Sequence, residues 1–215
     1  MSENGRLPTR SEVADSYDII ADDFDATRRK PWPETKEFID SLPFNSIILD
    51  VGCGNGRNAA HALNSDHKVV GIDISRRMLE IARAKCPAGD FILADAVYLP
   101  FKDGAFGAAM CVAVLPHIAN STERVEALRE MRRVLGARGA ALLGVWAVEQ
   151  ERLADRCDGD GNVWMEWALR DGAKAKRFYH LFAEIEFKSL VSESRFRLER
   201  YFFRCDNHYA LLSKT

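Results

Sequence analysis

The sequence predicts an α/β fold of the doubly wound type, and three observations support this. A short apolar run at 47–51 enters a glycine-rich turn and then a helix start, in the stretch IILDVGCGNGRN. Such a run suits a central strand that is covered on both faces of a parallel sheet. Further strands are expected at 67–73 and 91–94, each preceded by a helical segment. Two alternating stretches, Leu198–Phe203 and Asn207–Ser213, predict an antiparallel hairpin that completes the sheet.

The remaining elements follow from periodicity and from helix boundary signals. From Ser11 onward, apolar residues recur at the spacing of one helix face, and the prolines of the segment PWP at 31–33 stop this helix. Ser75 is expected to cap the helix after the second strand, and Ser121 or Thr122 the helix after the fourth. The other expected elements are helices at about 34–42, 57–63, 75–86, 122–135 and 182–193, and strands at 105–115 and 140–147.

Length and composition fit one α/β domain, 1–215, and exclude several other classes of protein. The formal net charge of −2 argues against nonspecific coating of nucleic acids or membranes. The five cysteines are far apart and form no C-x-x-C pair, so neither a disulfide framework nor an internal metal site is expected. The first residues, MSENGRLPTR, lack the apolar core of a secretion signal, and no apolar run approaches membrane-spanning length. We therefore expect a protein of the reducing cytoplasm.

The stretch D-x-G-x-G-x-G at 50–56 marks the expected ligand site, because open α/β sheets bind ligands outside the carboxyl ends of their strands. A dinucleotide site requires G-x-G-x-x-G, and the early third glycine here weakens a nicotinamide-cofactor interpretation. The next two strands end in Asp73 and in Asp95, which is followed by Ala96. Asp73 suits the two hydroxyls of a ribose, and Asp95 suits an adenine amino group, because a carboxylate accepts hydrogen bonds.

This constellation resembles the motifs of class I S-adenosylmethionine-dependent methyltransferases. The resemblance implies a Rossmann-like, doubly wound seven-stranded sheet with an antiparallel C-terminal strand, and S-adenosyl-L-methionine as the cofactor. It also implies that the glycines underlie the methionine part, that the acid after the second strand holds the ribose, and that the acid after the third reads the adenine. The cofactor-binding residues expected on this basis are Asp50, Gly52, Gly54, Gly56, Asp73, Ile74, Asp95 and Ala96.

Other segments resemble one family of tRNA methyltransferases, whose members esterify the carboxymethyl group of a modified wobble uridine. The resemblance extends from about Val13 to Ser213 and covers nearly the whole chain. It is carried by segments that are more specific than the glycine loop: YDIIADDF at 17–24, TRR at 27–29, PWP at 31–33, RFYHLF at 177–182 and DNHY at 206–209.

The chain departs from this family near the fourth strand. Pro116 precedes His117 where the family usually has two adjacent histidines, and Phe106-Gly107 replaces an aromatic residue followed by Asp. The first departure bears on the substrate site and not on the cofactor site. The family also implies a small zinc-binding activator protein as a partner, which adds a strand to an exposed sheet edge. Here that edge is expected at Phe91–Ala94.

The resemblance and the chemistry of the side chains together suggest an acceptor site. Arg28 or Arg29 is expected to hold a carboxylate or an adjacent phosphate through its guanidinium fork. His117, just past the fourth strand, is expected to shape the acceptor pocket. No metal site is expected, and the Asp-Gly repeat at 158–161 is read as a turn because the spacing of a calcium loop is absent. The residues expected to contact the base, the cofactor or the tRNA are Tyr17, Trp32, Arg177, Tyr179 and His180.

Residues 1–44 are expected to form lid helices, and 148–176 an insertion near the substrate whose polar first half is a mobile loop. Two other functions share the cofactor motifs: a small-molecule O- or C-methyltransferase, and a noncatalytic cofactor-binding or partner-binding domain. The strand-end acids also have an interpretation as turn formers, and His117 as a loop histidine bonded to backbone. The sequence leaves open which tRNA and base are used, the oligomeric state, and whether the protein is active alone.

Overall fold

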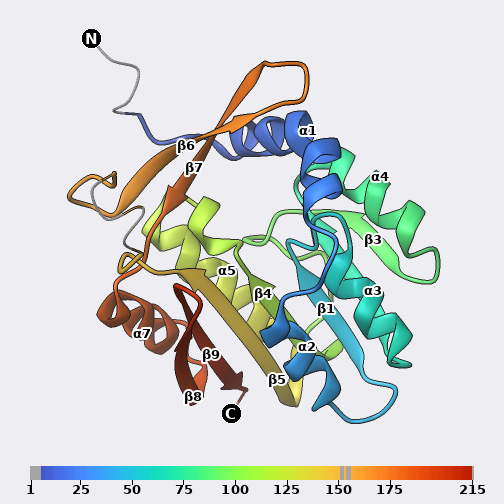
Figure 1. Cartoon of the computed structure of the whole chain (residues 1–215). Helices are drawn as coiled ribbons and strands as arrows, with labels where there is room; N and C mark the ends of the chain where they lie inside the picture. Colours follow the sequence, from blue (N-terminus) through green and yellow to red (C-terminus); the bar gives the residue numbers. More distant parts are fainter. Residues whose placement is uncertain (1–5, 151–152, 154–155, 215) are drawn as a thin grey trace.

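A seven-stranded sheet forms the centre of the computed structural model, which describes residues 6–150, 153 and 156–214. Its strands are β1 Ile47–Val51, β2 Lys68–Asp73, β3 Asp90–Leu93, β4 Phe106–Val112, β5 Leu135–Trp146, β8 Arg197–Arg204 and β9 Asn207–Ser213. They follow the order β3-β2-β1-β4-β5-β9-β8 (Figure 1). β1 to β5 run parallel, and β9 runs antiparallel between β5 and β8. This confirms the predicted Rossmann-like sheet with an antiparallel C-terminal strand.

Helices cover both faces of this sheet. The helices are α1 Arg10–Thr27, α2 Pro33–Asp40, α3 Arg57–Asn64, α4 Arg76–Lys85, α5 Ser121–Val134 and α7 Glu184–Glu193, of which all but α1 pack on the faces of the sheet, and a 3-10 turn, η2, spans Leu115–His117. Leu49 and Val51 of β1 belong to the apolar cluster that includes α5 and α7, whereas Ile48 belongs to the one that includes α2, α3 and α4. Because successive side chains of a strand point to opposite faces, the apolar run of β1 is buried on both.

The helix α1 lies across α4 and the hairpin strand β7 (Lys174–His180), on the side of the sheet where the parallel strands end (Figure 1). A capping box starts it: Thr9 Oγ1 accepts the backbone N–H of Glu12, whose carboxylate accepts the backbone N–H of Thr9. Further along, Ile20 packs with Met78 of α4 and Ala175 of β7. The predicted helix with one apolar face is confirmed, and that face holds α1 against α4 and β7.

A second, two-stranded antiparallel sheet of β6 (Asn162–Ala168) and β7 occupies the later part of the insertion, where the sequence predicted no strand. The alternation of apolar and polar residues does not indicate β7, because one of its buried side chains is charged. Arg177 is buried like Ala175, while Lys174 and Lys176 are exposed. The turn predicted at 158–161 is confirmed, since Asp158 accepts the backbone N–H of Asp160 within it and that of Asn162 just after it. The predicted mobile loop includes 151–152 and 154–155, which lie outside the described residues.

Several element boundaries also differ from the predicted ones. β4 ends early, at Val112, because Ala113 takes a left-handed φ of +60° and the chain turns into η2. Asn120 caps α5 in place of Ser121 or Thr122, and its side chain accepts two backbone N–H groups of the first turn. β5 begins earlier and α7 later than predicted. The predicted cap at Ser75 is confirmed.

The outer strands of the sheet are β3 and β8, which confirms the edge predicted at 91–94. On β3, Ile92 is 37% and Leu93 45% exposed. Within the described ranges, no helix is long and apolar enough to cross a membrane.

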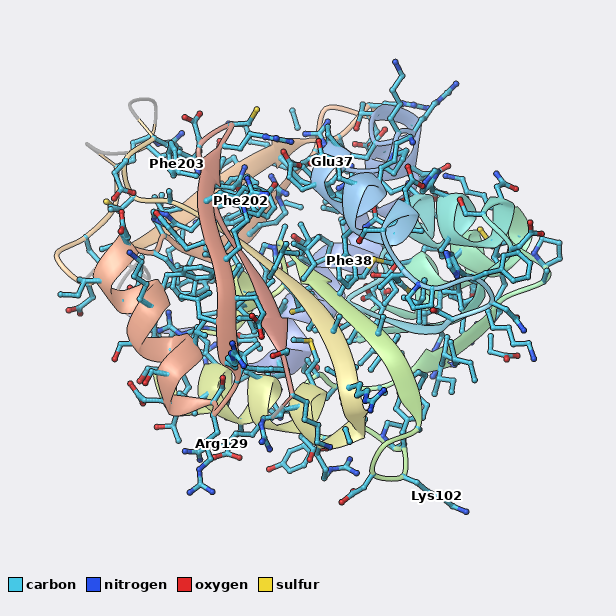
Figure 2. All side chains as sticks on the ribbon, turned by 90° about the horizontal axis from the view of Figure 1, so that it is seen from below. Glu37, Phe38, Lys102, Arg129, Phe202 and Phe203 are labelled. Carbon is cyan, nitrogen blue, oxygen red and sulfur yellow. The ribbon has the colours of Figure 1, made fainter. Side chains whose placement is uncertain are left out.

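At the opposite edge, α2 lies beside the β8–β9 hairpin. Arg204 of β8 forms an ion pair with Glu37 of α2 at 2.8 Å. Phe38 of α2 and Phe202 of β8 belong to one apolar cluster, and Figure 2 shows these labelled side chains from below. These contacts attach α2, the helix that follows α1, to the β8–β9 edge of the sheet.

Candidate active site

A cavity of about 720 Å³ lies between the carboxyl ends of the parallel strands, α1 and the β6–β7 hairpin. The residues that follow β1, β2, β3 and β4 form one wall, and side chains of α1 and the hairpin form the other. This is where open α/β sheets bind their ligands. Of the predicted site residues, those that line the cavity are Tyr17, Arg28, Trp32, Gly52, Gly54, Asp73, Ile74, Asp95, Ala96, His117, Arg177 and Tyr179.

Two carboxylates in this cavity come from the predicted strand ends. Asp73 accepts the backbone N–H of Gly54 at 2.8 Å and that of Ser75 at 2.9 Å, which fixes it against the glycine loop. Burial raises the pKa of Asp73. Asp95 accepts a hydrogen bond from Arg10 of α1 at 2.8 Å. Each carboxylate keeps free lone pairs, so the pair fits a ligand that carries hydroxyl and amino donors, such as adenosine.

The glycine loop fits a ligand that lies directly against its backbone. Gly54 has φ +53°, and the nearest atom to a Cβ added there is Cε1 of Phe24, 4.0 Å away. The neighbouring Asn55 donates its side-chain amide to Asp25 and to the carbonyl of Arg28. Its buried Oδ1 has no hydrogen-bond partner among the described residues. The loop therefore offers open space and one free acceptor, which suits the ammonium group of an amino acid.

Asp50 and Gly56 do not line the cavity, although the sequence assigned them to the cofactor. Gly56 has φ +77°, and a Cβ there would lie 3.1 Å from Cβ of Ala82, so this glycine allows α3 to approach α4. Asp50 is 2% exposed, and burial, followed by the nearby Asp73, raises the pKa of its carboxyl to about 8. Both residues support the loop from inside the fold.

A buried cation lies among aromatic rings where the hairpin borders the cavity. Cζ of Arg177 is 4.5 Å from the ring centroid of Trp167 and 5.1 Å from that of Tyr179. Arg177 is 8% exposed, and its Nε has no hydrogen-bond partner in the described part of the chain. Arg28 approaches the same Trp167 ring at 5.7 Å, and Trp146 stacks on Tyr179 with centroids 4.6 Å apart. This arrangement suits an anion attached to a planar group.

Two hydrogen bonds hold His117 in one tautomer. Nδ1 lies 2.9 Å from the carbonyl oxygen of Phe178, which only accepts, so Nδ1 carries the proton. Nε2 then accepts the hydroxyl of Tyr17 at 2.7 Å. Burial, and to a smaller extent Arg177, lowers the pKa of His117 to about 4. The ring is therefore neutral near pH 7 and joins α1 to β7, a positioning role rather than proton transfer.

Arg29 and His180 lie outside the cavity. Arg29 is exposed beyond the end of α1. His180 is 5% exposed, with Nδ1 3.0 Å from Asn162 Oδ1 and Nε2 2.7 Å from Glu186 Oε1, so it joins β7 to β6 and α7. Because successive side chains of a strand face opposite sides, Tyr179 and His180 do not both face the cavity.

Comparison with known proteins agrees with this geometry. A family model described as a methyltransferase domain matches residues 48–139. Over 220 aligned residues the chain is 30% identical to the tRNA (carboxymethyluridine(34)-5-O)-methyltransferase of Schizosaccharomyces pombe, covering 93% of this chain and 94% of that protein. The chain belongs to this methyltransferase family.

Other relatives are longer or more distant. The chain is 41% identical over 142 residues to the tRNA (carboxymethyluridine(34)-5-O)-methyltransferase alkbh8 of Xenopus tropicalis, an alignment that covers 66% of this chain and 22% of that protein. The chain thus spans about a fifth of the length of that relative. The CcbJ methyltransferase of Streptomyces caelestis has a TM-score of 0.78 at 18% identity, covering 95% of this chain and 99% of that one. That likeness shows the class I methyltransferase fold.

The cofactor that the sequence motifs imply for this methyltransferase is S-adenosyl-L-methionine. The cavity fits that cofactor: the carboxylates of Asp73 and Asp95 would accept from its ribose and adenine donors, and Gly54 would leave room for its tail. The free Oδ1 of Asn55 would accept from its ammonium group. When bound, the cofactor supplies an electrophilic methyl group.

Sequence reasoning did not single out Arg10, Arg57 or Trp167 as site residues of this methyltransferase. Arg10 forms ion pairs with Asp95 at 2.8 Å and with Glu123 at 2.9 Å, and so connects the start of α1 to the strand-end wall. Arg57 follows the glycine loop directly, and this adjacency was a readable signal. Trp167 had no such signal, because its place in the cavity depends on the unpredicted hairpin.

His117 is expected to titrate with a pKa of about 4. Since this value lies below the 6.5 of an unperturbed histidine, the unfolded chain binds the proton more readily. The contribution of His117 to the free energy of unfolding is therefore lost as the pH falls from about 6.5 toward about 4. Imidazole nitrogen NMR measures the pKa, and Tyr17→Phe, which removes the donor to the neutral ring, should raise it. A wild-type midpoint near 6.5 would contradict this account.

Proposed function

We propose that this methyltransferase esterifies the carboxymethyl group of a modified wobble uridine in tRNA. The observation that carries the proposal is the buried guanidinium of Arg177, which lines the cavity between the rings of Trp167 and Tyr179. A carboxylate attached to a planar base matches both the charge and the rings. The relatives from Schizosaccharomyces pombe and Arabidopsis thaliana are named for methyl transfer to carboxymethyluridine 34.

The side chains of the cavity act in this proposal by position. A carboxylate with a pKa of about 4 is already ionised near neutral pH, so the acceptor needs no general base. Arg177 orients this carboxylate toward the methyl group. The hydroxyl of Tyr17 and Nε2 of His117 are hydrogen-bonded to each other. These two side chains therefore shape the pocket, and the acceptor carboxylate stays ionised. The aromatic walls, including Trp32, exclude water from the acceptor oxygen.

Within one domain, 1–215, residues 1–44 act as a lid and 148–176 as a substrate-side cover. The lid contributes Tyr17 and Arg28 to the cavity, the cover contributes Trp167, and the middle of β7 contributes Arg177. The two covers are joined, because Ser16 of α1 donates to the carbonyl of Lys176 at 3.0 Å. The modified base enters the cavity either when the lid and the cover move apart or through an opening beside them. Arg28 and Arg177 then meet the tRNA from both covers.

The proposed location is the cytoplasm. Cys53, Cys86 and Cys111 are buried thiols that form no disulfide. Unpaired cysteines are typical of proteins that stay in a reducing compartment.

We also propose a small zinc-binding activator protein as a partner on β3. This outer strand exposes Ile92 and Leu93, and Tyr98 nearby in the chain is 73% exposed. An uncovered apolar edge strand is an aggregation hazard, and a partner that adds a strand removes it.

Leu93→Lys is expected to weaken this complex by about tenfold or more, because it places a charge on the edge to be covered. Co-purification and titration calorimetry with the partner measure the effect. Leu198→Lys is the matched control, since Leu198 is 38% exposed on the other outer strand, β8. Equal weakening by both variants, or by neither, would remove β3 as the docking strand.

Methyl transfer from labelled S-adenosylmethionine to bulk tRNA tests the proposed function. The tRNA comes from cells that lack this activity, so that its acceptor sites are unmethylated, and the assay is run with and without the zinc-binding partner. Nucleoside analysis is expected to find the label in the methyl ester of carboxymethyluridine. No label in RNA, together with measurable cofactor binding, would favour a small-molecule acceptor or a noncatalytic role.

A further inference from the structure

Three guanidinium groups line the cavity without an ion pair to a carboxylate of the described residues: those of Arg28, Arg57 and Arg177. The proposed reaction brings two carboxylates into this cavity, one on the acceptor and one on the methionine part of the cofactor. These need separate sites, because an acceptor oxygen must face the methyl group, while the other carboxylate serves only to anchor the cofactor. Arg57 and Arg177 lie on different elements, α3 and β7, and are candidates for the two sites.

Arg57 lies beside the open part of the glycine loop. It is the first residue of α3, directly after the loop. Its Cζ is 5.0 Å from the ring centroid of Trp32 and 5.9 Å from that of Phe24. Phe24 is also the nearest neighbour of a Cβ built on Gly54. The guanidinium and the space above Gly54 therefore share one neighbouring ring.

The ring on which Arg57 lies is fixed to the same helix. The backbone N–H of Trp32 donates to Asn58 Oδ1 at 3.3 Å, and the hydroxyl of Thr35 donates to the same oxygen at 3.0 Å. These bonds hold Trp32 in place on α3. The guanidinium of Arg57, which lies on the Trp32 ring, is thereby also oriented. A guanidinium that is already oriented loses little side-chain freedom when it binds an anion.

No carboxylate of the described residues forms an ion pair with Arg57. Burial, and then the nearby Arg28, lower the pKa of Arg57 to about 10. The nearby Asp50 raises the pKa of Arg57. Burial, however, raises the pKa of Asp50 itself to about 8, so its carboxyl is mostly protonated near pH 7. A bound carboxylate supplies the missing negative charge.

We propose that Arg57 binds the carboxylate of the methionine part of S-adenosylmethionine, which leaves Arg177 for the acceptor. Arg57 lies on the rings of Trp32 and Phe24, whereas the guanidinium of Arg177 lies between those of Trp167 and Tyr179. The inference rests on the proposed function through its cofactor and through the acceptor carboxylate that requires a second site, whereas its test involves cofactor ligands alone.

The test compares two ligands by titration calorimetry: S-adenosylhomocysteine, which carries the amino-acid tail, and 5′-methylthioadenosine, which lacks it. Arg57→Gln is expected to weaken S-adenosylhomocysteine by about 10- to 50-fold and to change methylthioadenosine by less than about twofold. Arg57→Lys keeps the charge without the planar fork and should lie between Arg57→Gln and the wild type. Arg76→Gln is the matched control, because Arg76 is the exposed first residue of the next helix, α4.

The outcomes separate the inference from its alternatives. Unchanged affinity for S-adenosylhomocysteine in Arg57→Gln, or equal weakening of both ligands, would overturn it, since equal weakening indicates a structural role. Selective loss of S-adenosylhomocysteine in Arg177→Gln, with Arg57→Gln unaffected, would assign the carboxylate to Arg177 instead. If the wild type binds neither ligand, the cofactor assignment fails, and the inference with it. Retained methylthioadenosine binding shows that a variant is folded.

Discussion

Arg177→Gln is expected to lower kcat/KM for methyl transfer to the carboxylate acceptor by about 10²- to 10³-fold. Glutamine stays polar but removes the charge and the planar fork, whose Cζ lies 4.5 Å from the centroid of the Trp167 ring. The acceptor carboxylate then loses its only proposed buried cation and its orientation toward the methyl group. Affinity for S-adenosylhomocysteine should stay within about twofold of the wild type, because the proposed cofactor residues lie on other elements.

The neighbouring Lys176→Gln is the control for this prediction. Lys176 precedes Arg177 on β7 but is exposed, so its loss removes the same charge from outside the cavity. Its effect on transfer should be less than about fivefold. Steady-state rates with the RNA acceptor and calorimetry with S-adenosylhomocysteine measure both quantities. Wild-type transfer by Arg177→Gln would show that another group anchors the acceptor.

Gly54→Val is expected to weaken cofactor binding by about 100-fold or more while the fold is retained. The added side chain would enter the space above the loop, where the nearest protein atom to the new Cβ is 4.0 Å away. It therefore meets the ligand before it meets the protein. Calorimetry with S-adenosylhomocysteine measures the loss, and circular dichroism with the thermal midpoint measures the fold.

Gly172→Val separates this effect from backbone strain. Gly172 also has a left-handed φ, +86°, and no atom lies within 4 Å of a Cβ built on it. It is outside the cavity, so valine there imposes comparable strain without filling the ligand space. Its cofactor affinity should match the wild type. If Gly54→Val binds the cofactor as tightly as Gly172→Val, the loop is not the surface on which the cofactor lies.

The cofactor part of the site was predictable because its residues follow consecutive parallel strands. Asp73 and Asp95 are far apart in sequence, but the ends of parallel strands meet at one edge of the sheet. The glycine loop was readable for the same reason, although its members differ: Gly54 faces the cavity, whereas Gly56 serves the packing of α3 on α4. The backbone conformation that requires a glycine is common to both roles, so sequence alone does not separate them.

The acceptor part was less predictable, because it depends on which side of an element faces inward. Arg28 lines the cavity and Arg29 does not, and the same division separates Tyr179 from His180. Which residue of each pair faces the cavity depends on where α1 ends and on the register of β7. The sequence pattern predicts neither. A buried arginine on β7 also breaks the apolar alternation that would reveal the strand.

The most direct test of the account uses a defined anticodon stem-loop that carries carboxymethyluridine at the wobble position. The same RNA with unmodified uridine, and with the corresponding carboxamide, are the comparisons, and the zinc-binding partner is present throughout. Mass spectrometry should find an alkali-labile methyl ester on the carboxylate RNA alone, since Arg177 is matched to an anion. Methylation of all three RNAs, or of none while a small carboxylic acid is methylated, would contradict the proposed function.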